Sequence, residues 1–259
     1  MSDPVGIWDT IEGRSVQARE YRDGPCRYEA EPDWEAELHR TLGLQWPCPD
    51  RLECGVLWRR VVSDVAGAGI RVGPESFNGF NDADAALVRA IWCLARHLRP
   101  LHAVETGVAH GFTSRFILEA FARNGSGDLS SIDRPPLDPT MRSRIGVAVE
   151  DRSRWTLISG TSRRRLPALL ARLGNIGLFV HDSLHTAENL LFELDWAWRH
   201  LGSGGALVVD DIDTNTGFRT FAATRPGQRT FVCEAEPVRP DHRRFNGKGL
   251  FGIILKGPV

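Results

Sequence analysis

Acidic and imidazole side chains stand where apolar stretches of this sequence break off. In the segment LFVHDSLHTAENLLFEL, Asp182 and His185 lie three residues apart, between an apolar run typical of a buried strand and a helical pattern. Two other apolar runs end in acids, one at Glu105 and one at the pair Asp210 and Asp211. Because ligands of open parallel sheets bind beyond the carboxyl ends of the strands, we expect these side chains to line one crevice.

The segment AVETGVAHGFTSRFIL indicates a strand, a glycine loop and the start of a helix. Gly107 and Gly111 let the backbone approach a ligand closely, and the helix N-terminus faces that ligand. The spacing is G-x-x-x-G rather than the dinucleotide fingerprint G-x-G-x-x-G, and Glu105 comes shortly before it. A pyrophosphate would meet a like charge there, whereas an ammonium and a sulfonium would find an opposite one. The pattern favours S-adenosylmethionine over NAD, although a glycine pair alone also fits a tight turn without a ligand.

Two further strand ends complete the expected donor site. Asp133 ends the run LSSID, 22 residues after Gly111, where an acidic acceptor for a ribose diol lies in folds of this kind. The run WTLISGTS ends at Gly160 and Thr161, which would border the adenine. The predicted donor-binding residues are Glu105, Thr106, Gly107, Gly111, Thr113, Ser114, Asp133, Gly160, Thr161 and Asp182.

The elements that carry these residues alternate regularly from residue 101 onwards. Short apolar runs are separated by helical patterns, which predicts a parallel sheet covered by helices on both faces. The last two runs, RTFVCEAEPV and GLFGIILKG, have only a turn-like segment between them. We expect that last pair to be antiparallel.

Residues 1–76 form a different region, rich in proline, glycine and charge. Two helical patterns, DWEAELHRTLG and LWRRVVSDVAGAG, and no convincing strand predict a helical and loop extension. We expect it to act as a lid or in acceptor recognition, in front of a donor-binding domain at 77–259. The first helix of that domain is predicted to be capped by Asn81 or Asp82 and stopped by Pro100.

Composition excludes several classes of function. The 259 residues are 42% hydrophobic and 25% charged, with a formal net charge of -1, so nothing indicates nucleic acid as a partner. No apolar run is long enough to span a membrane and no signal segment is evident, which predicts a cytoplasmic protein without a membrane partner. The five cysteines include no C-x-x-C pair. This indicates neither a disulfide framework nor a thiolate zinc site, and we interpret them as reduced, mostly buried thiols.

Taken together, the motifs resemble a known family. ETGVAHGFTS, Asp133 and the run from LFVHDSLHTAENLLFEL to LGSGGALVVDDI are similar to class I S-adenosylmethionine-dependent methyltransferases. More narrowly, they are similar to metal-dependent O-methyltransferases of antibiotic sugars and their relatives. The resemblance spans residues 77–256 and implies a Rossmann-like, doubly wound α/β fold with seven strands, the last of them antiparallel. It also implies natural product biosynthesis and leaves a homo-oligomer open, since relatives often assemble.

The resemblance further implies Mg²⁺ at Asp182, Asp210 and Asp211. Clustered carboxylates repel one another unless they take up protons or share a cation, and oxygen ligands suit a hard divalent ion. His185 is implied as the general base, a role that suits an imidazole with an ordinary pKa of about 6.5. The expected activity is O-methylation of a small-molecule acceptor, such as a sugar, a polyol or a catechol-like natural product.

Other interpretations stay open at this level. Asp182 would also suit the N-cap of the following helix, the pair Asp210 and Asp211 the cap of a turn, and His185 a solvent-facing position. A metallohydrolase also uses clustered acids with a histidine, but it does not predict Glu105 or Asp133. A non-catalytic relative that binds S-adenosylmethionine is the third alternative.

Overall fold

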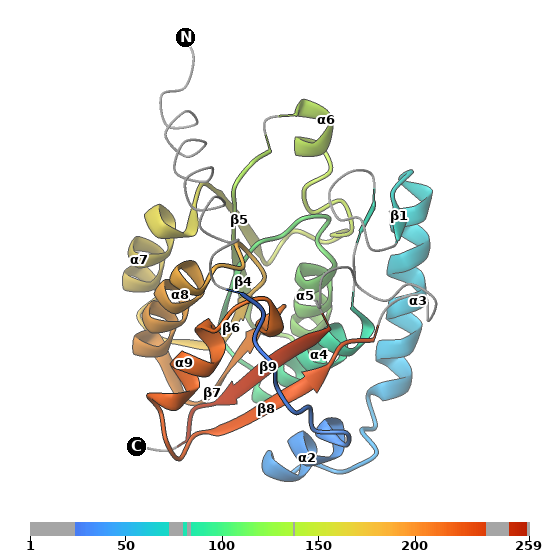
Figure 1. Cartoon of the computed structure of the whole chain (residues 1–259). Coiled ribbons are helices and arrows are strands. Elements are labelled where there is room, and N and C mark those ends of the chain that lie inside the picture. The colour runs from blue at the N-terminus through green and yellow to red at the C-terminus, as the bar shows by residue number, and fades with distance from the viewer. Residues whose placement is uncertain (1–23, 73–79, 82–83, 137, 237–248, 258–259) are drawn as a thin grey trace.

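A seven-stranded mixed sheet lies at the centre of the computed structural model, which describes residues 24–72, 80–81, 84–136, 138–236 and 249–257 (Figure 1). The strand order is β5-β4-β3-β6-β7-β9-β8. The strands are β3 (His102–Thr106), β4 (Asp128–Asp133), β5 (Trp155–Ser159), β6 (Ile176–His181), β7 (Leu201–Val209), β8 (Arg229–Glu234) and β9 (Leu250–Leu255). The five strands from β3 to β7 are parallel, and β9 is antiparallel to both β7 and β8. The predicted doubly wound sheet with an antiparallel last strand is confirmed.

Two groups of helices cover the two faces of the sheet (Figure 1). The first group is α2 (Trp34–Thr41), α3 (Arg51–Gly67), α4 (Ala85–Leu98) and α5 (Phe112–Asn124). The second is α7 (Ser162–Leu173), α8 (Ala187–His200) and α9 (Gly217–Ala223). The described chain also contains the short strands β1 (Arg71–Val72) and β2 (Phe80–Asn81), the one-turn helix α6 (Pro139–Arg142) and the 3-10 turn η1 (Ile212–Thr214).

Alternation along the central strands explains why their sequences are largely apolar. In β3, Ala103 packs into the core under the first helix group and Val104 into the core under the second. In β6, Val180 and Phe179 divide in the same way. Because helices cover both faces, neither set of side chains in β3 and β6 meets water, whereas the edge strand β5 is partly exposed.

Helix α4 begins later than the sequence predicts. Its N-cap is Asp84, whose side chain accepts a hydrogen bond from the backbone N–H of Ala86 at 2.8 Å. The predicted cap at Asn81 or Asp82 is therefore wrong, although Asp82 itself lies outside the described residues. The helix ends at Leu98, two residues before Pro100, as predicted.

The two helices predicted for the extension are present as α2 and α3. Their buried residues, including Trp34, Leu38, Leu57 and Val61, belong to the same core cluster as α4 and the sheet. The predicted boundary near residue 76 lies outside the described residues and stays a prediction. Among the described helices, none combines the length and the apolar character needed to cross a bilayer. All five cysteines are free thiols, as expected, and four of them are buried.

Candidate active site

Three neighbouring parallel strands bring their polar ends to one edge of the sheet. The end of β6 is level with that of β7, because His181 pairs with Val209 in the register. The N–H of Asp182 donates to the carbonyl of Thr106 on β3, and the N–H of Asp210 donates to the carbonyl of His181, each at 2.9 Å. The residues after the strands are thereby fixed side by side, as the sequence predicts.

Asp182, His185 and Asp210 form a compact group. One ligand atom from each lies within 4.8 Å of the other two. His185 Nε2 is 3.8 Å from Asp182 Oδ1 and 3.5 Å from Asp211 Oδ2. Asp182 is the open member, with 31% of its side chain exposed, whereas the side chain of His185 is 14% exposed. The structure therefore brings the predicted acids together and adds an imidazole among them.

This group fits a divalent cation. Two ligand oxygens on opposite sides of a Mg²⁺ ion are about 4.2 Å apart, since each bond is about 2.1 Å long. A separation of at most 4.8 Å needs only a small closure of the side chains. The compact group contains His185 instead of Asp211, which differs from the predicted set Asp182, Asp210 and Asp211. Since Mg²⁺ prefers oxygen ligands, the carboxylates of Asp182 and Asp210 are the groups that would hold it.

The backbone around the group favours function over simple capping. The N-cap of α8 is Thr186, whose hydroxyl accepts from the N–H of Asn189 at 3.1 Å, so Asp182 is not needed as the cap. Asp211 is the N-cap residue of η1, but its side chain makes no capping hydrogen bond, and its φ of 51° is a left-handed conformation that is uncommon outside glycine. Strained residues of this kind cluster at functional sites.

The glycine loop lies against the end of β6. Gly107 has a φ of +83°, and a Cβ there would lie 1.8 Å from the carbonyl oxygen of Asp182. Gly111 has a φ of +85°, and its Cβ would lie 2.8 Å from the Cα of Gly146. Both glycines are therefore required by close contacts within the protein, in addition to any approach of a ligand.

Asp133 holds the glycine loop from the end of β4. Its Oδ2 accepts hydrogen bonds from the N–H groups of Val108 and Ala109, each at 3.1 Å. Burial raises the pKa of Asp133 to about 6, although the two N–H groups oppose the shift. Gly160, predicted near the adenine, lies beside it, since its N–H donates to the carbonyl of Asp133 at 2.9 Å. Thr161 follows as the N-cap residue of α7.

Glu105 lies behind the loop rather than on its surface. Its side chain is fully buried, and its oxygens accept hydrogen bonds from Thr113 at 2.5 Å, Ser114 at 2.6 Å and Ser131 at 2.7 Å. Trp155 Nε1 donates to Ser131 in turn, at 2.9 Å. Burial raises the pKa of Glu105, and the three hydroxyls oppose that shift. The expected direct contact with the donor is not the arrangement seen for Glu105, Thr113 and Ser114, which instead join β3 to the start of α5.

A second buried acid was not predicted. Glu193 on α8 accepts hydrogen bonds from Thr106 Oγ1 at 2.5 Å, Ser183 Oγ at 2.7 Å and Asn189 Nδ2 at 2.9 Å. Its Oε2 also lies 2.6 Å from Nδ1 of His181. Burial alone would raise the pKa of Glu193, but the His181 ring and the hydroxyl donors lower it to about 2. The signal available in the sequence is helical spacing, which places Glu193 on the buried face of α8.

The comparisons with known proteins fit this arrangement. Residues 104–212 match the model of a family described as a methyltransferase domain. This part of the chain is therefore similar to methyltransferase domains. It includes the glycine loop, Asp133 and the group at the ends of β6 and β7, which confirms the resemblance inferred from the motifs. The chain matches no curated protein.

Solved structures share the fold of the methyltransferase domain. The O-methyltransferase TomG from Streptomyces achromogenes, involved in tomaymycin synthesis and solved with SAM, is 20% identical, with a TM-score of 0.52 over 68% of this chain and 82% of that one. The O-methyltransferase from Bacillus cereus, solved with SAH, is 14% identical, with a TM-score of 0.51 over 78% of this chain and 91% of that one. At these identities the likeness establishes the fold.

Proposed function

We propose that this protein transfers the methyl group of S-adenosylmethionine to a hydroxyl of a small-molecule acceptor, with Mg²⁺ held by Asp182 and Asp210. The observation that carries the proposal is the group Asp182, His185 and Asp210 beside the glycine loop of a methyltransferase domain. The two O-methyltransferases solved with SAM or SAH support the donor. The acceptor class is a sugar, a polyol or a catechol-like natural product, because two adjacent oxygens would fill open positions on the metal.

The donor would lie against the glycine loop. The loop backbone from 107 to 111 and the start of α5 are oriented by Asp133 and Glu105 from behind. Asp133 uses Oδ2 for the loop, and we assign its Oδ1 to the ribose hydroxyls. Gly160 and Thr161 would border the adenine. Buried Glu105 supports this region from behind without touching the ligand.

His185 is the proposed base. Its Nε2 would take the proton of the acceptor hydroxyl, whose pKa bound Mg²⁺ lowers. The carboxylates of Asp182 and Asp211, 3.8 and 3.5 Å from Nε2, stabilise the imidazolium that forms. The acceptor oxygen then forms a bond to the methyl carbon as the bond from that carbon to sulfur breaks, leaving S-adenosylhomocysteine. This in-line step requires mainly alignment and the exclusion of water.

The first test is calorimetric titration of chelator-treated protein with S-adenosylhomocysteine. We expect binding without metal, because Asp182 is the only predicted donor-binding residue that is also a proposed metal ligand. Paramagnetic Mn²⁺ then serves as the metal probe, followed by the loss of its free spin-resonance signal. A folded protein that does not bind S-adenosylhomocysteine would contradict the proposed donor.

Variants separate the two halves of the site. Asp182→Asn and Asp210→Asn should lose Mn²⁺ binding and turnover with an acceptor panel, while affinity for S-adenosylhomocysteine stays nearly intact. Asp195 is a half-exposed acid of α8 that pairs with Arg225, and Asp195→Asn is the matched control that should change neither. Loss of donor affinity with unchanged turnover at saturation would refute the assigned roles.

A further inference from the structure

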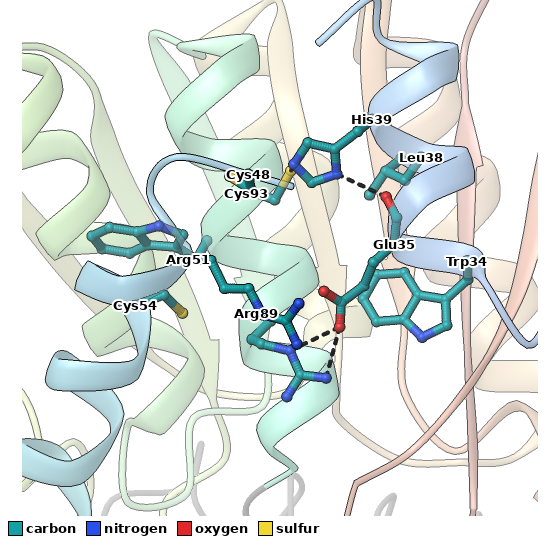
Figure 2. Close-up of a pocket in the computed structure, with 10 residues that line it drawn as sticks. Trp34, Glu35, Leu38, His39, Cys48, Arg51, Cys54, Arg89 and Cys93 are labelled. Atoms are coloured by element: carbon teal, nitrogen blue, oxygen red, sulfur yellow. Dashed lines mark hydrogen bonds and ion pairs between the residues drawn. The ribbon is translucent and has the colours of Figure 1, made fainter. Parts of the chain in front are cut away.

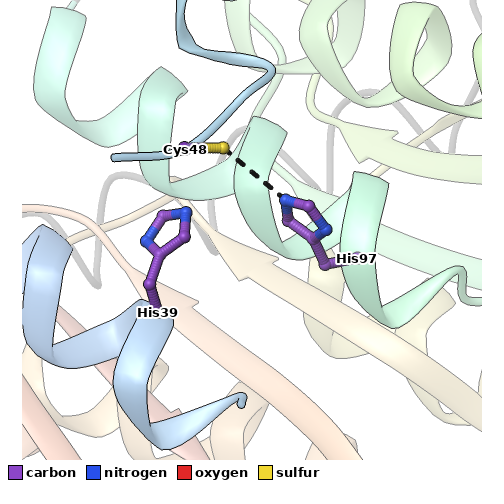
Figure 3. Close-up of side chains that lie close together, drawn as sticks. All are labelled: His39, Cys48 and His97. Carbon is purple, nitrogen blue, oxygen red and sulfur yellow. Dashed lines mark hydrogen bonds between the residues drawn. The ribbon is translucent and has the colours of Figure 1, made fainter. Parts of the chain in front are cut away.

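A second group of metal-ligating side chains lies away from the candidate active site. His39 on α2, Cys48 in the segment between α2 and α3, and His97 in the last turn of α4 point toward one another (Figure 3). Their ligand atoms all lie within 4.8 Å of one another. His97 lies just before β3 begins at His102, whereas the candidate active site follows the carboxyl ends of the strands. The two groups therefore lie at opposite ends of the parallel strands.

Two sulfur–nitrogen contacts, one within this group and one from Cys93 of α4 to His39, have the lengths expected of a zinc site. Cys48 Sγ is 3.6 Å from His97 Nε2, and Cys93 Sγ is 3.5 Å from His39 Nε2. In a tetrahedral site with Zn–S bonds of about 2.3 Å and Zn–N bonds of about 2.05 Å, neighbouring sulfur and nitrogen ligands are about 3.5 to 3.6 Å apart. A thiol that is hydrogen-bonded to an imidazole gives the same distances. The partner of the other ring nitrogen of His39 therefore helps to distinguish the two cases.

The ring of His39 is already oriented as in metal sites. Its Nδ1 lies 2.7 Å from the backbone carbonyl oxygen of Glu35, which can only accept, so Nδ1 carries the proton. Nε2 therefore presents its lone pair toward the thiols. Histidines that bind metals commonly donate their second N–H to a carbonyl in this way. Trp46 packs against the same ring, with centroids 4.9 Å apart.

The chemistry of the ligand atoms determines which metal ion suits this group. Imidazole nitrogens and thiolates suit Zn²⁺, whereas Mg²⁺ and Ca²⁺ prefer oxygen ligands. Cys93 and His97 are separated by one turn of α4, so both can face one ion. A pocket beside the group is lined by His39, Cys48 and Cys93 together with Cys54 and Trp34 (Figure 2).

We propose that His39, Cys48 and His97 bind a structural zinc ion, with Cys93 as the fourth ligand. The ion joins α2 and the segment that follows it to α4, whose His97 comes 49 residues after Cys48. Because binding energy at such a site adds to folding energy, zinc stabilises the docking of the extension on the sheet. This inference does not depend on the proposed methyl transfer, and either can fail alone.

The test begins with tag-free protein, stripped of metal under reducing conditions. We expect one equivalent of Zn²⁺ to bind and to raise the melting temperature. Co²⁺ should give the strong thiolate-to-metal absorption and the visible bands of a tetrahedral site. These spectra come from the unmodified protein, so they do not depend on any variant folding. Absence of both Zn²⁺ uptake and the Co²⁺ spectrum would overturn the proposal.

Variants assign the ligands. Cys48→Ala and His97→Ala should lose stoichiometric Zn²⁺ binding, with the fold checked by circular dichroism. Cys54→Ala, a buried thiol beside the same pocket, is the matched control and should retain binding. Equal binding by Cys48→Ala and Cys54→Ala would contradict the site. Cys93→Ala should remove one of the two thiolate contributions to the Co²⁺ spectrum, and an unchanged spectrum would refute its role as the fourth ligand.

Discussion

Oε2 of Glu193 lies 2.6 Å from Nδ1 of His181, and both side chains are completely buried. Since the carboxylate can only accept, His181 donates through Nδ1. The His181 ring meets the ring of His185 edge to face, with centroids 5.6 Å apart. This pair therefore forms a rigid support for the proposed base, built from the end of β6 and the middle of α8.

Breaking the buried pair should destabilise the protein strongly. We expect Glu193→Gln to lower the free energy of unfolding by about 3 to 5 kcal/mol, because the buried His181 ring loses its carboxylate partner. Urea denaturation at neutral pH measures this change. Glu188 lies on the same helix as Glu193, and Glu188→Gln, which removes its half-exposed ion pair with Arg163 of α7, should cost far less. Equal losses in the two variants would contradict a special role for the buried pair.

The same pair predicts the direction of a pH effect. The pKa of Glu193 is lowered from 4.5 to about 2, so its stabilising contribution is present above pH 4.5 and is lost as the pH falls through 2. The difference in unfolding free energy between the wild type and Glu193→Gln should therefore be constant from neutral pH down to 4.5 and narrow below that. A difference that instead narrows above pH 7 would contradict the assignment.

Gly107 should tolerate no side chain. In Gly107→Ala, the new Cβ would overlap the carbonyl oxygen of Asp182, 1.8 Å away, and φ is positive as well. We expect lower stability together with weaker Mn²⁺ binding, because the displaced residue is a proposed ligand. Gly67→Ala in α3, where a Cβ meets open space, is the matched control and should gain about 0.4 to 1 kcal/mol.

Donor affinity should depend on pH through Asp133. Its pKa is raised to about 6, and the ribose hydroxyls would donate to the ionised carboxylate. Affinity for S-adenosylhomocysteine should fall below pH 6, by up to about tenfold per pH unit. Calorimetry across pH 5 to 8 in Asp133→Asn should show weaker and flatter binding. The effect of this group on stability has the opposite sign, since its contribution is full below pH 3.8 and is lost as the pH rises through 6.

His185 can be distinguished as a base or a ligand. As a base, His185→Ala should reduce kcat by about 10² to 10⁴, remove the acidic limb of the pH–rate profile and leave Mn²⁺ affinity unchanged. Its distance from the acids also suits a ligand of a softer ion. A fall in Mn²⁺ affinity in proportion to the loss of turnover would therefore reassign His185 to the metal.

Features that depend on local chemistry were predictable from the sequence. Strand and helix order follows from apolar periodicity, and the acids after β6 and β7 stand out because a buried strand rarely ends in several charges. The position of Asp133 followed from the spacing of strands in this fold. What the sequence does not contain is the direction in which each side chain points, so Glu105 was expected at the ligand although its hydroxyl partners hold it inside.

Features that depend on distant parts of the chain were not predictable. His39, Cys48 and His97 lie on three separate elements, and the absence of a C-x-x-C pair argued against zinc. The spacing of Cys93 and His97, one turn apart on a helix, was the available signal. Similarly, Glu193 was one acid among the charges of α8 until packing showed that it faces the core.

The shared core of α2, α3, α4 and the sheet limits how the extension can be exchanged. Trp34 packs edge to face on Phe251 of β9, with ring centroids 5.4 Å apart. A graft that replaced the extension with one from another protein would have to reproduce that apolar surface. Otherwise apolar side chains on one face of the sheet would be exposed to water. Point changes on exposed positions of α3 therefore disturb this core less than exchange of the whole segment would.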